Sequence, residues 1–180
     1  MRRREFISAL LVGLYAGTSN NARAHTPYKQ WNVYRRKHLL IGCHKDRDET
    51  YVMAKTVVGV LEQHLPKASA RVARAPTVQR IASLMATDQM DVAIVKPEDA
   101  GAMAQGIDNF KPYGEIALSE LLQVEDLSMV CQSDVPDRHA WLITDALIDN
   151  LPQAVINDRQ SGLALHSGAK LRYAGQPMPL

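Results

Sequence analysis

Strand-like apolar runs alternate with amphipathic, helix-like segments through the middle of this 180-residue chain. The apolar runs are 38–43, 69–74 and 90–95. The segments with apolar residues at helical spacing are 50–64, 76–85 and 97–103. This order is typical of an α/β domain, in which each helix connects two parallel strands. The strands carry few polar residues, which indicates a sheet covered on both faces. We therefore expect an α/β fold with a mainly parallel sheet flanked by helices.

The second half of the chain continues this pattern less regularly. Short strands are expected at 116–118 and 127–131, which brings the sheet to about five strands. Apolar residues at helical spacing predict a helix over 138–150. A last short helix is expected over 166–173, with Ser167 as its N-cap.

The first 24 residues contain the parts of an export signal in the right order. Residues 3–7 match the twin-arginine signature Arg-Arg-x-Phe-Ile, and an apolar stretch follows at 9–16. This stretch is too short to cross a bilayer as a helix, which needs about 20 apolar residues. Ala22 and Ala24 fit the small-x-small pattern of signal peptidase. We predict a twin-arginine signal peptide that is cleaved after Ala24, and a periplasmic protein.

Cleavage at this point would leave 156 of the 180 residues, enough for one domain with its own core. We expect residues 25–37 to be a leader segment and 38–180 a single α/β lobe. The signal carries four arginines and one glutamate, so the rest of the chain has a net charge of about −1, against +2 for the whole. That balance does not favour nucleic acid, which needs clustered Lys and Arg. No second apolar run predicts stable membrane insertion.

The two cysteines, Cys43 and Cys131, leave the question of a disulfide open. An exported protein with an even number of cysteines can form a bridge. Both residues, however, lie in apolar strand-like runs, where a free thiol packs as a small hydrophobic group. Bridging requires Cα atoms about 5.5–6 Å apart, and the sequence does not give that distance.

Several short motifs occur in the order in which a known family has them. They are Leu40-Ile-Gly42, Glu49-Thr-Tyr51, Pro76-Thr-Val-Gln-Arg-Ile-Ala-Ser-Leu84, Met90-Asp-Val-Ala-Ile-Val95, Leu142-Ile-Thr-Asp-Ala-Leu147 and Leu165-His-Ser-Gly-Ala169. The series resembles the solute-binding proteins of TRAP transporters in the TAXI group, which are type II periplasmic binding proteins. The likeness covers most of residues 38–173. It implies a lobe of the type II periplasmic-binding-protein kind.

A ligand of such a lobe is expected in the crevice at the carboxyl ends of the strands, where helix N-termini converge. The candidate ligand-binding residues at that edge are Thr50, Tyr51, Pro76, Thr77, Lys96 and Glu98. The resemblance implies that Thr50, Tyr51 and Thr77 supply donors to a small organic anion. We favour the alternative that Thr50 and Thr77 only cap helices, a position that threonine prefers, and that Tyr51 packs against its neighbours.

Two features depart from the family pattern. The family has two lobes, whereas here 134–137 leads directly into the expected helix, so we expect the first lobe alone. The glycine-rich turn that follows the first strand in the family is replaced here by 43–48, which contains Asp46 and Asp48. Glycines would let the backbone approach an anionic ligand, whereas these carboxylates would repel it.

Metal-binding and catalytic patterns are weak. Cys43, His44, Asp46 and Asp48 are close enough in sequence to hold a metal on a loop, but their spacing matches no zinc motif. His25, if it became the N-terminus, could chelate copper together with its amine. Neither a nucleophile elbow nor a paired acid and base is evident. We expect no cofactor, no resident metal and no enzymatic activity.

Two functions follow from these observations. The first is an exported, solute-binding-like protein, related to TRAP transporter substrate receptors, that binds a small organic anion weakly if at all. The alternative is a non-catalytic accessory or assembly subunit of a periplasmic protein complex, or a homodimer. A lobe without its partner lobe exposes apolar surface, and such surface usually contacts another protein.

Overall fold

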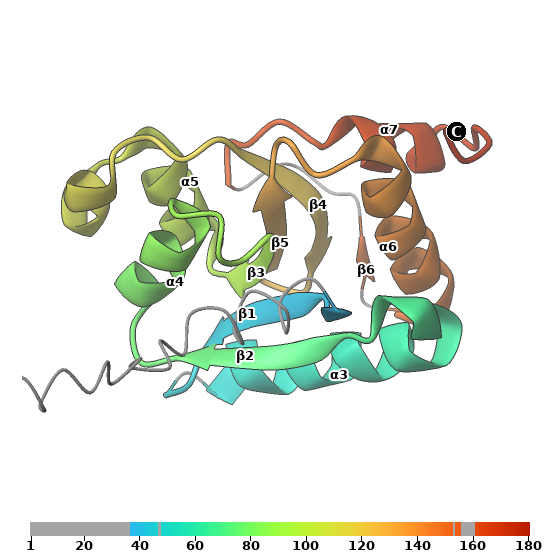
Figure 1. Cartoon of the computed structure of the whole chain (residues 1–180), viewed down its shortest axis with the longest axis horizontal. Coiled ribbons are helices and arrows are strands. Elements are labelled where there is room, and N and C mark those ends of the chain that lie inside the picture. The colour runs from blue at the N-terminus through green and yellow to red at the C-terminus, as the bar shows by residue number, and fades with distance from the viewer. Residues whose placement is uncertain (1–36, 47, 153, 156–160) are drawn as a thin grey trace, which may run out of the picture. The chain divides into compact units, whose positions relative to one another are not determined.

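The predicted alternation of strands and helices is present in the computed structural model, which describes residues 37–46, 48–152, 154–155 and 161–180 (Figure 1). The α/β class is therefore confirmed. The predicted signal peptide, its cleavage site and the leader up to residue 36 lie outside the described residues.

The first unit of the fold joins two parallel strands through a long helix. Its elements are β1 (Leu40–His44), α3 (Asp48–His64), the short 3-10 helix η1 (Pro66–Ala68) and β2 (Arg71–Ala75). The strands pair in register from Leu40 opposite Arg71 to His44 opposite Ala75. Pro66 has no backbone N–H and cannot continue α3, so the chain turns back into the sheet after this helix.

The second unit carries the chain across β1 to the other side of the sheet. Its elements are α4 (Val78–Met85), β3 (Val92–Val95), α5 (Pro97–Gln105) and the 3-10 helix η2 (Asp108–Tyr113). The predicted N-cap of α4 is confirmed, because the Thr77 side chain accepts a hydrogen bond from the Arg80 backbone N–H at 3.1 Å. Right-handed connections that run in opposite directions place α3 and α4 on opposite faces of the sheet, as Figure 1 shows.

The sheet is mixed rather than mainly parallel. β4 (Leu118–Val124) and β5 (Leu127–Gln132) form a hairpin, whose turn includes Glu125 at φ 55°. β5 lies between β3 and β4 and is antiparallel to both. The two-residue strand β6 (Ala154–Val155) pairs antiparallel with β4. The strand order is β2-β1-β3-β5-β4-β6. The prediction of a mainly parallel sheet is wrong because an apolar pattern reports the burial of a strand but not its direction.

The C-terminal helices are α6 (Asp137–Asn150) and α7 (Ser167–Tyr173), and they pack against each other. The predicted strand at 116–118 begins only at Leu118. The sequence pattern misses the rest of β4, in which the polar pair Glu120 and Gln123 is buried and hydrogen-bonded at 3.3 Å. The prediction of Ser167 as an N-cap is also wrong. His166 caps α7, since its Nδ1 accepts a hydrogen bond from the Gly168 backbone N–H at 3.1 Å.

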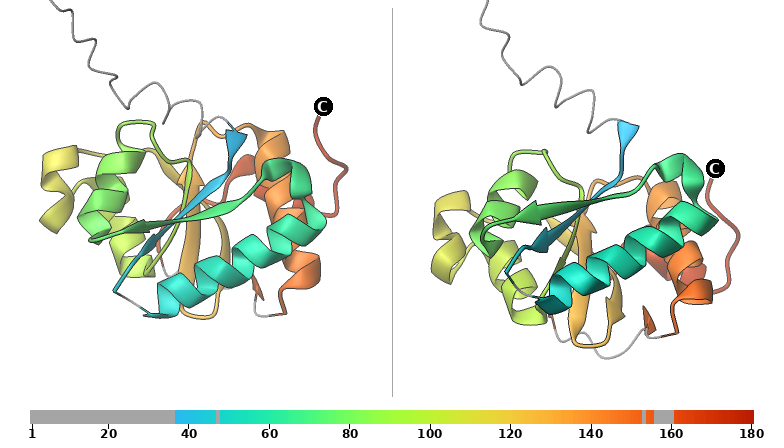
Figure 2. Two further views of the ribbon diagram at one scale, coloured as in Figure 1. Left: turned by 60° about the horizontal axis from the view of Figure 1, so that its bottom comes forward. Right: turned by 90° about the horizontal axis from the view of Figure 1, so that it is seen from below.

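Hydrophobic side chains fill both faces of the sheet, as the nearly continuous apolar strands predict. Figure 2 shows the helices that cover these faces. β3 shows the alternation clearly. Val92 and Ile94 pack toward α3 and α6, whereas Ala93 and Val95 pack toward α4 and α5. In the described part of the chain, no helix has the length and apolar character needed to cross a membrane.

Cys43 and Cys131 are free thiols, and both are buried. Cys43 lies on β1 and Cys131 on β5, with β3 between them. Neighbouring strands are about 4.8 Å apart, so two spacings already exceed the Cα separation that a disulfide tolerates. The structure therefore favours two free, buried thiols over a disulfide. Burial raises the pKa of Cys43 to about 11 and that of Cys131 to about 12.

We predict that neither thiol reacts with a disulfide reagent such as dithiobis(nitrobenzoate) at about pH 8 in the folded protein, because the thiolate is the reactive form. Both should react readily in denaturant. The absorbance of the released thiolate over time measures the reaction. A thiol that reacts as fast in the folded protein as in the unfolded chain would contradict this burial.

The contact between α6 and α7 depends on Gly168. A Cβ at this position would lie 2.1 Å from the carbonyl oxygen of Asp137, so Gly168→Ala should destabilise the fold by about 1–3 kcal/mol. Gly59 in α3 is a matched control, since nothing lies within 4 Å of an added Cβ there. Gly59→Ala should stabilise the protein by about 0.5–1 kcal/mol. Urea unfolding measures both changes, and equal stability of the two variants would refute this packing.

Candidate functional site

Lys96 lies at the edge of the sheet where the sequence predicts ligand binding, directly after β3. Its Nζ is 2.7 Å from Asp126 Oδ2 and 3.6 Å from Glu49 Oε1. The hydrogen bond between Lys96 and Asp126 raises the pKa of the lysine and lowers that of the aspartate. The lysine that the sequence offers to an anion is thus already paired with two carboxylates.

Thr50 and Tyr51 are engaged by the fold at the same edge. Thr50 is buried, and its Oγ1 donates a hydrogen bond to the His44 carbonyl oxygen at 3.2 Å. Tyr51 is half-buried, and its ring has two cations against it. The Lys55 ammonium and the Arg74 guanidinium lie 5.5 and 5.4 Å from the ring centroid. The contact with Arg74 stabilises the packing of α3 against β2, whereas Lys55 lies on α3 itself.

Pro76, Thr77 and Glu98, the other predicted site residues, are exposed. The Thr77 hydroxyl is occupied as the cap of α4. Glu98 lies in the first turn of α5, where a negative charge is favourable next to the helix dipole. The six predicted residues therefore lie near one edge, but Thr50, Thr77 and Lys96 have protein partners there.

The loop after β1 does not assemble a metal site from its described side chains. Cys43 is buried in the core, and His44 Nδ1 accepts a hydrogen bond from the Asp46 backbone N–H at 3.1 Å. Within the ranges that the structure describes, no three His, Cys, Asp or Glu side chains form a group suited to a metal ion. His25 lies outside these ranges.

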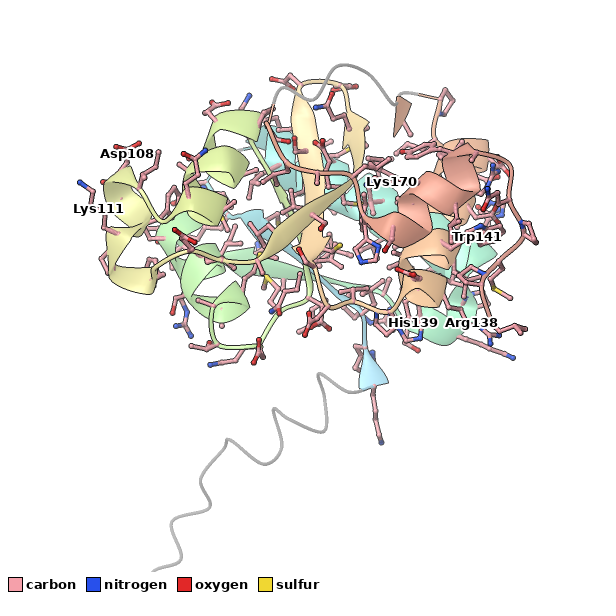
Figure 3. All side chains as sticks on the ribbon, turned by 90° about the horizontal axis from the view of Figure 1, so that it is seen from above. Asp108, Lys111, Arg138, His139, Trp141 and Lys170 are labelled. Carbon is pink, nitrogen blue, oxygen red and sulfur yellow. The ribbon has the colours of Figure 1, made fainter. Side chains whose placement is uncertain are left out.

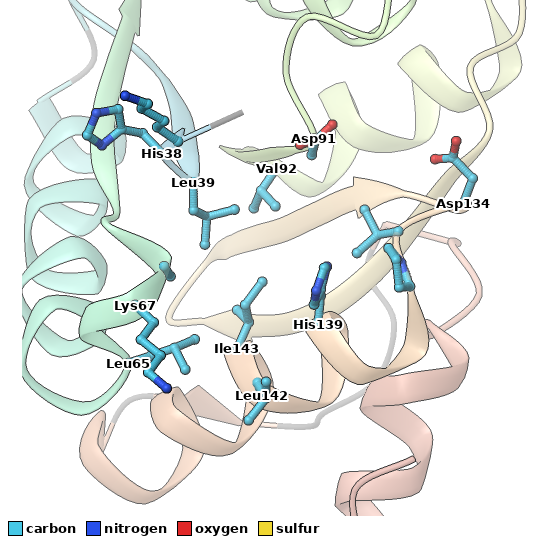
Figure 4. A pocket seen from close by; sticks show the side chains of 14 residues that line it. His38, Leu39, Leu65, Lys67, Asp91, Val92, Asp134, His139, Leu142 and Ile143 are labelled. Atoms are coloured by element: carbon cyan, nitrogen blue, oxygen red, sulfur yellow. The ribbon is translucent and has the colours of Figure 1, made fainter. Parts of the chain in front are cut away.

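A pocket of about 580 Å³ lies at the opposite edge of the sheet, where β1 and β3 begin and β5 ends (Figure 4). This volume is in the range of ligand sites, about 300–1,000 Å³. The pocket is bounded by η1 on one side and by the first turns of α6 on the other. The large apolar side chains in its lining are Leu39, Leu65, Val92, Val135, Leu142 and Ile143.

Charged side chains of opposite sign flank this apolar lining. The basic group is Lys37, His38 and Lys67, from the start of β1 and from η1. The acidic group is Asp91 and Asp134, from the start of β3 and the end of β5, with His139 of α6 beside them. Figure 4 shows His38 and Lys67 on one side of the pocket and Asp134 on the other, with His139 between them in this view.

Asp91 lies in unfavourable surroundings for a carboxylate. Asp91 is exposed, but partial desolvation raises its pKa, and the negative charges of Asp134 and Asp88 raise it further. His139 acts in the opposite direction. A positive charge placed near Asp91 would relieve this repulsion and stabilise the ionised carboxylate.

Sequence reasoning does not identify this pocket, although two signals point toward it. Asp91 is the one charged residue in the apolar run 90–95, and 134–137 is the segment that leads directly into α6. No sequence pattern, however, identifies Lys67 as a candidate site residue. These residues meet only because β5 pairs antiparallel with β3, which the apolar pattern does not predict.

The raised pKa of Asp91 has a testable consequence for stability. A carboxyl whose folded pKa lies above its unfolded pKa stabilises the fold when protonated, and this contribution is lost as the pH rises through the folded pKa. Asp91→Asn should therefore raise the melting temperature at about pH 7.5, and the gain should disappear as the pH falls to about 4. Circular dichroism melts over this pH range measure the effect. Glu125→Gln, in the exposed β4–β5 turn, should show no such gain, and a gain of equal size would contradict this origin.

No protein-family model matches the chain, and no curated protein is similar enough to match it. The geometry of the pocket and the order of the sequence motifs are therefore the observations on which a function can be argued.

Proposed function

We propose that this protein is a non-catalytic binding protein of the bacterial periplasm that holds a small organic ligand. The observation that carries the proposal is the pocket of about 580 Å³ between η1 and α6. The export signal in residues 1–24 supports the compartment, and the motif series supports a relation to TAXI-type solute-binding proteins.

The charges favour the amino-end pocket over the carboxyl-end crevice as the binding site. At the carboxyl ends, Lys96 is neutralised by Glu49 and Asp126, so a small anion would have to compete with two carboxylates. At the amino ends, the negative charges of Asp91 and Asp134 lie on the same side of the pocket and repel each other. A positively charged group on a ligand would relieve that repulsion. The ligand class of the resembling family, a small organic anion, is therefore less well supported than a ligand that carries a positive charge.

A second candidate function is an accessory or assembly subunit, as the sequence also suggests. A neighbouring pocket of about 300 Å³ shares Asp134 with the first and is also lined by Asp88 and Glu115. The second pocket and the acidic side of the first pocket together form a wider acidic surface along this edge. A protein partner with basic and apolar side chains would cover both.

Native mass spectrometry of the mature protein, purified from the periplasm of its own host, tests the proposal. We expect a monomer that carries a small molecule. Leu142→Trp should abolish this occupancy by filling the pocket from α6, where Leu142 is only half-buried. Val52→Trp is the matched control, since Val52 is 58% exposed on α3 and does not line the pocket.

The possible outcomes separate the two candidates. A small molecule that is present in the wild type and in Val52→Trp, but absent from Leu142→Trp, supports a ligand site in the pocket. A small molecule that stays bound to Leu142→Trp excludes this pocket as the site. A chain without a ligand, held in a stoichiometric protein complex, favours the accessory subunit.

A further inference from the structure

The smaller pocket, of about 300 Å³, differs from the larger one in the sign of its charges. It lies between the end of α4, the segment that joins η2 to β4, and the end of β5. Its charged side chains are Asp88, Glu115 and Asp134, and no Lys, Arg or His is present in its described lining. Every charged group that a ligand meets in this pocket is therefore a carboxylate.

Gln132 adds an uncharged acceptor to these carboxylates. Its side chain is only 8% exposed, and it lines the pocket. Its Nε2 donates to the carbonyl oxygens of Met85 and Met90, which fixes the orientation of the amide because a carbonyl oxygen can only accept. Among the described residues, Oε1 has no hydrogen-bond donor. It is also not one of the fully enclosed polar atoms without a partner, so it keeps accessible surface at the pocket.

An unpaired acceptor on an almost buried side chain is unusual, because buried polar groups are normally hydrogen-bonded. Gln132 is held in place by its two donated bonds, so Oε1 cannot turn toward a donor elsewhere in the protein. The donor that satisfies this oxygen has to enter the pocket from outside. The pocket therefore offers a ligand acceptors only, three of them charged and one neutral.

The end of α4 also favours a positive charge in this pocket. Met85, the last residue of the helix, and Ala86, its C-cap, are both in the lining. The last carbonyl groups of a helix carry a partial negative charge, which stabilises a cation near them. The helix end and the three carboxylates thus act in the same direction.

The arrangement is suited to an organic amine rather than to a metal ion. A metal ion needs several ligands around one point, and no three His, Cys, Asp or Glu side chains of the described residues are grouped in that way. An ammonium group carries three N–H donors and no acceptor, so it complements a set of separated acceptors. We infer that the smaller pocket binds a primary aliphatic amine, whose ammonium group donates to Gln132 Oε1 and to the carboxylates beside it. The inference goes beyond the proposed function, because it assigns a site to a second pocket.

Isothermal titration calorimetry with four probes tests this. The probes are diaminobutane, its fully N-methylated form, butanediol and calcium chloride. Diaminobutane should give saturable binding. The methylated form keeps both charges but has no N–H, so it should bind about tenfold or more weakly, as expected when hydrogen bonds to charged acceptors are lost. Butanediol, which has no charge, and Ca²⁺ should give no saturable binding.

Two variants locate the amine in the pocket. Asp88→Asn and Glu115→Gln should each weaken the binding of diaminobutane by about threefold to tenfold, since each removes one partly exposed carboxylate. Asp88 has φ 51°, a conformation that asparagine adopts readily, so this change preserves the turn. Asp108→Asn is the matched control, because Asp108 lies at the outer end of η2 and does not line the pocket (Figure 3). It should bind diaminobutane as the wild type does.

The inference is overturned if diaminobutane does not bind, if the methylated form binds equally well, or if Asp108→Asn weakens binding as much as the two pocket variants. Ca²⁺ binding that is lost in the pocket variants would replace the amine by a metal ion. Leu142→Trp separates this inference from the proposed function, since Leu142 lines only the larger pocket. Diaminobutane should bind this variant unchanged. If its binding is lost there but kept in Glu115→Gln, the amine is a ligand of the larger pocket, and only the present inference fails.

Discussion

Gln132 holds the end of β5 against the start of β3, and the whole amino edge of the sheet depends on this contact. Its backbone N–H donates to the Asp91 carbonyl oxygen at 2.9 Å. Its side-chain Nε2 donates to the carbonyl oxygens of Met85 and Met90 at 2.8 and 3.1 Å. Because these bonds are buried, their loss would leave unpaired polar groups in the core. The pairing of β5 with β3 brings Asp134 close to Asp91 and directs the chain into α6. The acidic side and the apolar lining of the pocket therefore both depend on the position of β5 between β3 and β4.

Charged side chains are arranged differently at the two edges of the sheet. At the carboxyl edge, acidic and basic side chains pair with each other, as Lys96 does with Glu49 and Asp126. At the amino edge, basic side chains lie on one side of the pocket and acidic side chains on the other. The ionised form of Asp91 is disfavoured there because other negative charges are close to it. Surface ion pairs contribute little to stability, so the main effect of these pairs is that the charges at the carboxyl edge locally cancel. The amino edge keeps an electrostatic field that an external molecule can use.

Much of the fold could be predicted from the sequence, because most elements have a clear periodicity. The apolar runs locate β1, β2, β3 and β5, and Thr77 marks the start of α4. What the sequence does not provide is strand direction and the tertiary partner of each polar residue. The direction of β5 depends on a hairpin turn at Glu125, a residue type without a strong turn preference. Thr50 and Lys96 look free in the sequence, yet each has its partner in the structure. The pocket could not be predicted because it depends both on the direction of β5 and on which polar residues meet in the tertiary structure.

The position of the two thiols on separated, buried strands has a consequence for how the domain matures. Because neither Cys43 nor Cys131 can reach the other, no covalent cross-link within the chain is needed to complete the core. The folded state is therefore independent of the redox potential of its surroundings. The same structure can form in a reducing compartment and persist in an oxidising one, without a disulfide isomerase to assist it. A chain exported in its folded state would benefit directly from this property, since its folding can be finished before it crosses the membrane.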